Sequence, residues 1–170
     1  APVSDGELAV EIVPQVGCSQ VGLLLRASVG SGGAGETGHE LVFEPRESRL
    51  TLRQLTGAGV VSLASRDGVA LRGDRLKVRV RLEGGRMAVY LGDDAAPAMQ
   101  STAATGFSTS GHLGVRAWGS GVSLDQFRWT PSGGAPRPLW AERPPNWARH
   151  RAFESACLLM LNLNEVAYVD

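Results

Sequence analysis

The sequence predicts an all-β fold, an antiparallel β-sandwich or jelly roll, followed by a C-terminal α-helix. Short apolar runs recur along most of the chain, and 22 of its 170 residues are glycine, which indicates many turns. Most runs alternate apolar and polar residues, which is the period of a strand with one buried face. No convincing helical pattern lies between these runs, and a chain of this length fits one main core.

The first five strands are expected within the first 65 residues. Leu8, Val10 and Ile12 alternate with their neighbours and predict the first strand. Glycines gather between residues 30 and 38, which predicts a loop. The dipeptide Asp67-Gly68 is typical of a turn after the fifth strand. The second to fifth strands are expected over residues 21–27, 39–44, 49–55 and 60–65.

Residues 75–91 carry the clearest pattern, that of a β-hairpin. Gly84-Gly85 supplies two residues that tolerate positive φ, as a tight two-residue turn requires. The return strand continues the alternation through Met87, Val89 and Leu91. On the first strand one side is apolar and the other is basic: Leu76, Val78, Val80 and Leu82 alternate with Lys77, Arg79, Arg81 and Glu83. A solvated sheet face is the favoured interpretation of the basic row, and a second ligand surface is the alternative.

The rest of the chain predicts two more strands and a tail. After a polar loop over 92–111, strands are expected over 112–118 and 122–129. Prolines and glycines then indicate a linker, and a helix with Asn146 as its N-cap is expected to end near Glu165. The three expected parts are therefore a sandwich over 1–130, a Pro-rich linker over 131–145 and a helical tail over 146–170.

The strand sequences resemble concanavalin A-like jelly rolls of the laminin-G-like and bacterial sugar-associated type. The segment Gly111–Trp118 fits that family's "G-x-x-G-hydrophobic" strand, and Val122–Trp129 fits the "hydrophobic-x-hydrophobic-D-x-F" strand after it. Val21–Arg26 and the hairpin fit two further strands of the family. The opening strands of such a jelly roll are not visible before Asp5, so the resemblance implies an incomplete domain.

The tail resembles the C-terminus of large multidomain planctomycete proteins that also contain cytochrome-c-like domains. Those chains commonly end in "L-N-x-N-E-F-x-Y-V-D", and here Val166 replaces the phenylalanine. The resemblance implies an exported, periplasmic or extracellular bacterial parent, although the chain begins without a signal peptide. The tail helix is apolar on most sides, so we expect it to pack against protein. The residues expected to make these partner contacts are Trp147, Phe153, Cys157, Met160 and Leu161.

Composition excludes several classes of partner. Seventeen basic residues balance seventeen acidic ones, so nucleic acid is not expected as a ligand. No apolar run approaches the length needed to span a bilayer.

The sequence contains no C-x-x-C-H haem motif, and we expect no cofactor and no metal. Asp93-Asp94 with Asp125 or Asp5 is the one weak calcium candidate, and a solvated turn is the favoured interpretation. Whether Cys18 and Cys157 pair is left open.

Catalytic motifs are scarce. His39, His112 and His150 stand apart from any nucleophile motif, and no G-x-S-x-G or H-E-x-x-H pattern occurs. Glu40 and Glu44 share a strand face, but four residues along one strand is too far for a retaining glycosidase. Enzyme activity is therefore uncertain, and its absence is the favoured interpretation.

The best ligand candidate is the pair Arg116 and Trp118. Alternation places both side chains on the strand face opposite Leu113, Val115 and Ala117. An exposed tryptophan can stack on the apolar face of a sugar, while a neighbouring guanidinium donates to hydroxyl or acidic groups. The leading hypothesis is a non-catalytic carbohydrate-binding or adhesion-type module that binds a polysaccharide or oligosaccharide. The alternatives are a structural module that docks onto other domains or chains, and a sugar hydrolase-like domain.

Overall fold

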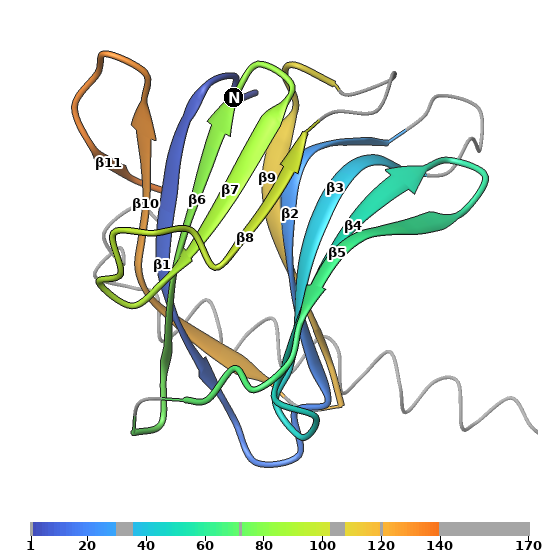
Figure 1. Cartoon of the computed structure of the whole chain (residues 1–170), viewed down its shortest axis with the longest axis vertical. Coiled ribbons are helices and arrows are strands. Elements are labelled where there is room, and N and C mark those ends of the chain that lie inside the picture. The colour runs from blue at the N-terminus through green and yellow to red at the C-terminus, as the bar shows by residue number, and fades with distance from the viewer. Residues whose placement is uncertain (1, 30–35, 72, 103–107, 120, 140–170) are drawn as a thin grey trace, which may run out of the picture. The chain divides into compact units, whose positions relative to one another are not determined.

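The computed structural model describes residues 2–29, 36–71, 73–102, 108–119 and 121–139. These residues form two antiparallel sheets that face each other (Figure 1). The six-stranded sheet has the order β11-β10-β1-β6-β7-β8, and the five-stranded sheet has the order β5-β4-β3-β2-β9. The strands are β1 (Gly6–Pro14), β2 (Gln20–Val29), β3 (Glu36–Glu44), β4 (Arg49–Thr56), β5 (Val60–Arg66), β6 (Leu76–Glu83), β7 (Arg86–Leu91), β8 (Met99–Thr102), β9 (His112–Trp118), β10 (Val122–Pro131) and β11 (Arg137–Pro138).

The prediction of an all-β antiparallel sandwich is confirmed. Alternate residues of both sheets point inward and form one apolar core. On β6 the buried Leu76, Val78, Val80 and Leu82 alternate with more exposed residues, as the hairpin pattern predicted. The largest fully buried side chain is Trp129 on β10, and Phe43 on β3 is also fully buried.

Three features differ from the sequence-based expectations or extend them. Strand β8 lies inside the segment expected to be a loop, where it pairs with β7. Strand β3 begins at Glu36, within the glycine-rich segment. Part of the expected linker also lies against the sandwich, since Leu139 N donates to Phe127 O at 2.9 Å. The expected tail helix and its contact residues Trp147, Phe153, Cys157, Met160 and Leu161 lie outside the described residues.

Arg26 occupies a β-bulge near the end of β2 and turns into the interior of the sandwich. Its φ of +49° lies in the left-handed region. The register of β2 shifts at this point against both β3 and β9. Strict alternation would turn Arg26 outward, whereas the bulge buries its side chain to 1% exposure.

The Arg26 guanidinium joins segments that are far apart in the sequence. Nη2 donates to Ser4 O at 3.0 Å and to Asp5 Oδ1 at 2.6 Å, and Nη1 donates to Gly84 O at 2.6 Å. Gly84 N also donates to Asp5 Oδ1, at 2.9 Å. Arg26 belongs to the five-stranded sheet, and Gly84 forms the β6–β7 turn of the other sheet. This cluster therefore ties the two sheets together at one end of the sandwich.

His39 lies on the core side of β3, beside Arg26. It is opposite Leu25 in the β2–β3 register and is 1% exposed. Burial, and secondly the positive charge of Arg26, lower the pKa of His39 from 6.5 to about 4. The imidazole is therefore neutral in the folded protein at pH 7.

Replacing Arg26 tests how much the buried cluster stabilises the fold. Arg26→Met should lower the free energy of unfolding by about 3–5 kcal/mol, because the substitution leaves buried carbonyl groups without their donor. Arg26→Lys should restore only part of this loss, since an ammonium lacks the planar fork of donors. Urea denaturation at pH 7 measures both values. A loss under about 1 kcal/mol for Arg26→Met would contradict the role assigned to the cluster.

The low pKa of His39 predicts a pH-dependent loss of stability. Between pH 6.5 and about 4 the unfolded chain holds a proton on His39 that the folded chain lacks. The stabilisation is therefore complete above pH 6.5 and decreases as the pH falls, by roughly 3 kcal/mol in total. Denaturation midpoints measured from pH 7 to pH 4 should fall less for His39→Gln than for the wild type. If the denaturation midpoints of the two proteins fell equally with pH, the lowered pKa of His39 would not be the cause of the loss of stability.

Candidate functional site

Arg116 and Trp118 lie together on the outward face of the five-stranded sheet. Trp118 is opposite Gln20 in the β2–β9 register, and Arg116 is opposite Gly22. Leu113 and Val115, on the other side of β9, pack against the core. Trp118 is 37% exposed and is one of the few large apolar side chains on the surface of the described residues. The structure therefore places both residues of the predicted pair on this outward face, with Trp118 exposed and Arg116 partly exposed.

Gly22 lies at the point where these side chains converge. A Cβ atom added at this position would lie 2.4 Å from Glu40 Oε1 and 3.2 Å from Trp118 Cζ3. The indole ring and the Glu40 carboxylate therefore occupy the space that a side chain at position 22 would fill. Glycine permits this close approach, although its φ is not positive.

Two carboxylates flank the Arg116 guanidinium. Nη2 contacts the carboxylate of Glu36, and Nε lies 3.8 Å from Glu40 Oε1. Glu40 is 3% exposed, and its Oε1 has no hydrogen-bond partner among the described residues. Burial raises the pKa of Glu40, and the nearby charge of Arg53 opposes that shift. The carboxylates therefore hold the position of Arg116 and offset its charge.

A hydrogen-bonded row crosses the sheet next to Trp118. Gln20 Nε2 donates to Glu44 Oε1 at 2.9 Å, and Arg49 Nε donates to Glu44 Oε2 at 2.8 Å. The hydrogen bond from Arg49 is the main cause that lowers the pKa of Glu44. Both oxygens of Glu44 thus have partners within the protein, unlike Oε1 of Glu40.

A small hollow lies further along the same face. Its volume is about 200 Å³. It opens next to the bulge of β2, where the register with β9 shifts between Leu24 and Ala27. Glu36, which contacts Arg116, also lines it. The lining residues are Leu24, Ala27, Ser28, Glu36, His112, Leu113 and Gly114.

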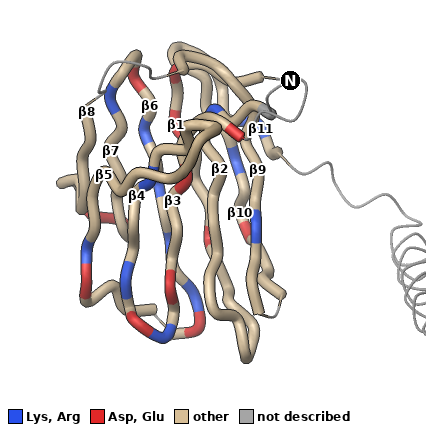
Figure 2. Tube along the Cα trace, turned by 90° about the vertical axis from the view of Figure 1, so that its right-hand side faces the viewer, with Lys and Arg blue, Asp and Glu red and all other residues tan. Residues whose placement is uncertain are grey.

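The basic row of the six-stranded sheet is neutralised by acidic neighbours. Arg81 Nη2 lies 3.4 Å from Glu7 Oε2, and Lys77 Nζ lies 3.7 Å from Glu11 Oε1. Arg79 lies over the ring of Tyr90, 4.9 Å from its centroid. Figure 2 shows acidic positions as well as basic ones along the strands of the sandwich. These contacts favour a solvated, ion-paired face over a second ligand surface.

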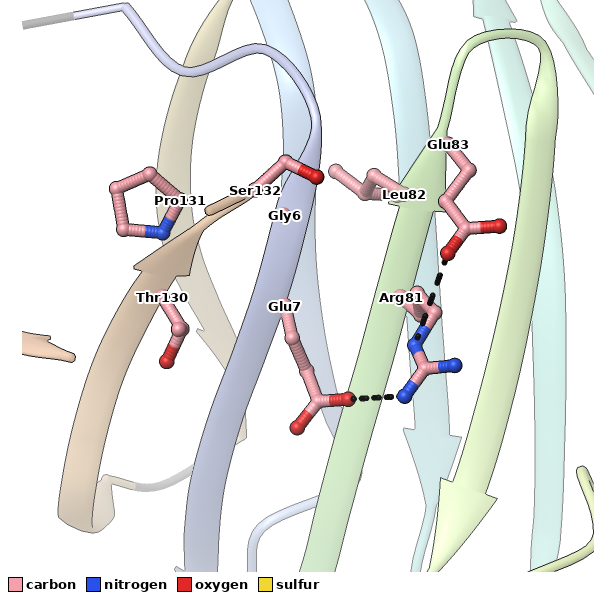
Figure 3. A pocket seen from close by; sticks show the side chains of 8 residues that line it. All are labelled: Gly6, Glu7, Arg81, Leu82, Glu83, Thr130, Pro131 and Ser132. Atoms are coloured by element: carbon pink, nitrogen blue, oxygen red, sulfur yellow. Dashed lines mark hydrogen bonds and ion pairs between the residues drawn. The ribbon is translucent and has the colours of Figure 1, made fainter. Parts of the chain in front are cut away.

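A second hollow, of about 300 Å³, lies on this six-stranded sheet (Figure 3). Glu7 and Glu83 flank Arg81 across its floor, and Thr130, Pro131 and Ser132 form the opposite wall. Its lining contains no aromatic side chain. It therefore lacks the stacking surface that Trp118 provides on the other sheet.

Three of the carboxylates considered for calcium lie beside basic side chains. Asp5 bonds to Arg26, Asp125 Oδ2 lies 3.8 Å from Arg75, and Asp93 Oδ1 lies 3.9 Å from Lys77. No group of three or more His, Cys, Asp or Glu side chains able to hold a metal occurs among the residues that the structure describes.

Among these described residues, no helix is long and apolar enough to cross a membrane. His39 is buried in the core and His112 is exposed on β9.

Sequence reasoning did not find Glu36, Glu40 or Gly22 as parts of this site. Glu36 fell in a segment expected to be a loop, and Glu40 was considered only as a glycosidase carboxylate. Gly22 did carry a signal, because a glycine inside an apolar strand often marks close approach of another group. The partner at that position depends on the β2–β9 register, which the local sequence does not encode.

Comparison with known proteins supports the fold. No protein-family model matches the chain, and no sequence of a characterised protein matches it. The carbohydrate-binding module CBM66 from Bacillus subtilis is similar in structure, with a TM-score of 0.61 and 15% identity over 75% of each chain. The Caenorhabditis elegans galectin LEC-6 has a TM-score of 0.54 and 14% identity, over 72% of this chain and 79% of the galectin. Sheep galectin-11, solved in complex with glycerol, has a TM-score of 0.52 and 11% identity, over 73% of this chain and 94% of the galectin. The chain therefore has a jelly-roll β-sandwich fold like these proteins, which confirms the prediction of a jelly-roll sandwich.

Proposed function

We propose that the chain is a non-catalytic carbohydrate-binding module, and that it acts within a larger exported bacterial protein as the tail resemblance implies. The exposed Trp118 beside Arg116, on the outward face of the five-stranded sheet, is the observation that carries this proposal. The names of the similar structures, a carbohydrate-binding module and galectins, add support. A shared fold alone does not define a ligand, so the ligand is inferred from the site.

The site suits the two chemical sides of a sugar ring. The indole of Trp118 offers a flat apolar surface for the C–H face of the ring. Arg116 is partly exposed beside it, so the part of its guanidinium away from the buried Nη2 offers donors to hydroxyl oxygens. Because Glu36 and Glu40 flank the guanidinium, its orientation is fixed before a ligand arrives. This preorganisation reduces the entropic cost of binding.

The charge balance of the face favours a neutral glycan. Each guanidinium on this part of the sheet lies near a carboxylate, in the pairs Arg116 with Glu36, Arg53 with Glu40 and Arg49 with Glu44. A polyanionic glycan would meet no net positive potential here and would lie close to three carboxylates. We therefore expect a neutral oligosaccharide or polysaccharide, recognised by stacking and hydroxyl hydrogen bonds.

Substitutions at the pair test the proposal. A glycan array of neutral and acidic polysaccharides, followed by calorimetry on the best neutral hit, should detect binding by the wild type. Trp118→Ala should weaken that binding by at least about tenfold, because the stacking surface is lost. Arg116→Ala should also weaken it. Arg128→Ala is the matched control, since Arg128 is exposed on the six-stranded sheet, and it should bind like the wild type.

Two results would contradict the proposal. One is the absence of binding to every glycan at millimolar concentration. The other is equal weakening by Arg128→Ala and Arg116→Ala, which would move the ligand away from this face. Binding only to acidic glycans, with affinity that falls steeply with salt, would contradict the preference for a neutral ligand.

Gly22→Ala tests the convergence above Gly22 separately. The added methyl would displace the Glu40 carboxylate and press on the Trp118 ring. The displaced atoms lie at the free ends of side chains, so the free energy of unfolding should change by only about 1 kcal/mol or less. Affinity for the neutral glycan should nevertheless fall several-fold. Calorimetry and urea denaturation of the same sample separate the two effects, and unchanged affinity would show that the position of Trp118 does not depend on Gly22.

A further inference from the structure

We propose that the ligand is a chain of several sugar units that lies lengthwise along β9, from Trp118 to a second subsite in the hollow beside Leu24. This inference rests on the proposed carbohydrate-binding function. It adds the direction of the bound chain and its minimum length, together with a second set of contact residues.

The first step is the spacing along β9. Trp118, Arg116, Gly114 and His112 are separated by two residues each, so they occupy one face of the strand. At about 3.3 Å per residue, Trp118 and His112 lie about 20 Å apart along the strand. A single monosaccharide cannot contact both positions, whereas an oligosaccharide can.

The second step is the chemistry of the hollow. The surface of the hollow is mostly apolar, and Leu24, Ala27 and Leu113 are among the residues that line it. An apolar surface of this kind suits the C–H face of a sugar ring. A volume of about 200 Å³ is below the roughly 300–1,000 Å³ of sites for drug-sized ligands. The hollow therefore suits one ring of a chain rather than a whole ligand.

The third step is the connection between the two places. Arg116 extends from the Trp118 side to Glu36, which lines the hollow. The ion pair therefore forms a polar bridge between the two subsites, with donors and acceptors for the units between them. Leu24 packs against Gly114, since a Cβ at position 114 would lie 3.1 Å from Leu24 Cδ1, so a larger residue there would displace the leucine that lines the hollow.

The alternative route across the strands is less favourable. There, next to Trp118, Gln20, Glu44 and Arg49 already hydrogen-bond to one another. Beside that row, Val42 on β3 is fully buried and offers a ligand no surface. The lengthwise route offers an open hollow instead, so we assign the ligand to that direction.

Ligand length is the variable to test. The probes are neutral gluco-, manno-, galacto- and fructo-oligosaccharides, each from monosaccharide to hexasaccharide, measured by calorimetry on the full chain. Affinity for the bound series should increase by at least about tenfold from the shortest ligand that binds to the longest. Leu24→Ser should remove most of this gain in affinity for long ligands and leave the affinity for the shortest ligand unchanged. Val61→Ser, a change from an apolar to a polar residue on exposed β5 of the same sheet, is the matched control.

His112→Ala is a second variant, because His112 is exposed and its replacement leaves the core intact. It should also weaken the long ligands and leave the short ones unchanged. If Trp118→Ala abolishes binding but affinity is independent of length, the lengthwise inference is wrong and the proposed function stands. The lengthwise inference is equally wrong if Leu24→Ser and His112→Ala both bind long ligands like the wild type. If no series binds, both the inference and the proposed function are wrong.

Discussion

The buried guanidinium of Arg26 is the interaction on which the arrangement of the two sheets depends. A charged side chain in a sandwich core is costly unless each of its donors has a partner. Here Ser4 O and Asp5, just before β1, and Gly84 O, in the β6–β7 turn, supply those partners. Burial, together with the charge of Arg26, lowers the pKa of His39 and keeps it neutral, so the end of the core holds one cation rather than two. The positions of the N-terminal segment and the β6–β7 turn are thereby fixed relative to β2.

The bulge that turns Arg26 inward also shapes the outward face. Its extra residue shifts the β2–β9 register between Leu24 and Ala27, which is where the hollow opens. On one side of β2 the bulge completes a buried charge cluster, and on the other side it makes space beside the Arg116–Glu36 ion pair. The core and the candidate site therefore share one structural cause. A substitution that removed the bulge would alter both.

Most strands and the face of the candidate site could be predicted from the sequence, because a period of two is a local property. The alternation around Val115 was sufficient to place Arg116 and Trp118 on one side of β9. The bulge was not predictable, because Arg26 interrupts an apolar run with no glycine or proline beside it to indicate an irregularity. Strand β8 was missed because Met99–Thr102 is short and mostly polar. The convergence of Glu40 and Trp118 above Gly22 depends on pairing between strands that are distant in the sequence, which no local pattern specifies.

The outward face of the five-stranded sheet, beside β9, is the surface that we assign to a neutral glycan. An NMR titration of the isotope-labelled chain with the best-binding neutral oligosaccharide tests this assignment. The indole Nε1–H signal of Trp118 and the amide signals of β9 and β2 should shift together with one affinity, while those of β6 and β7 stay in place. Shifts confined to β6 and β7, around Arg79 and Tyr90, would instead place the ligand on the six-stranded sheet and overturn the proposal.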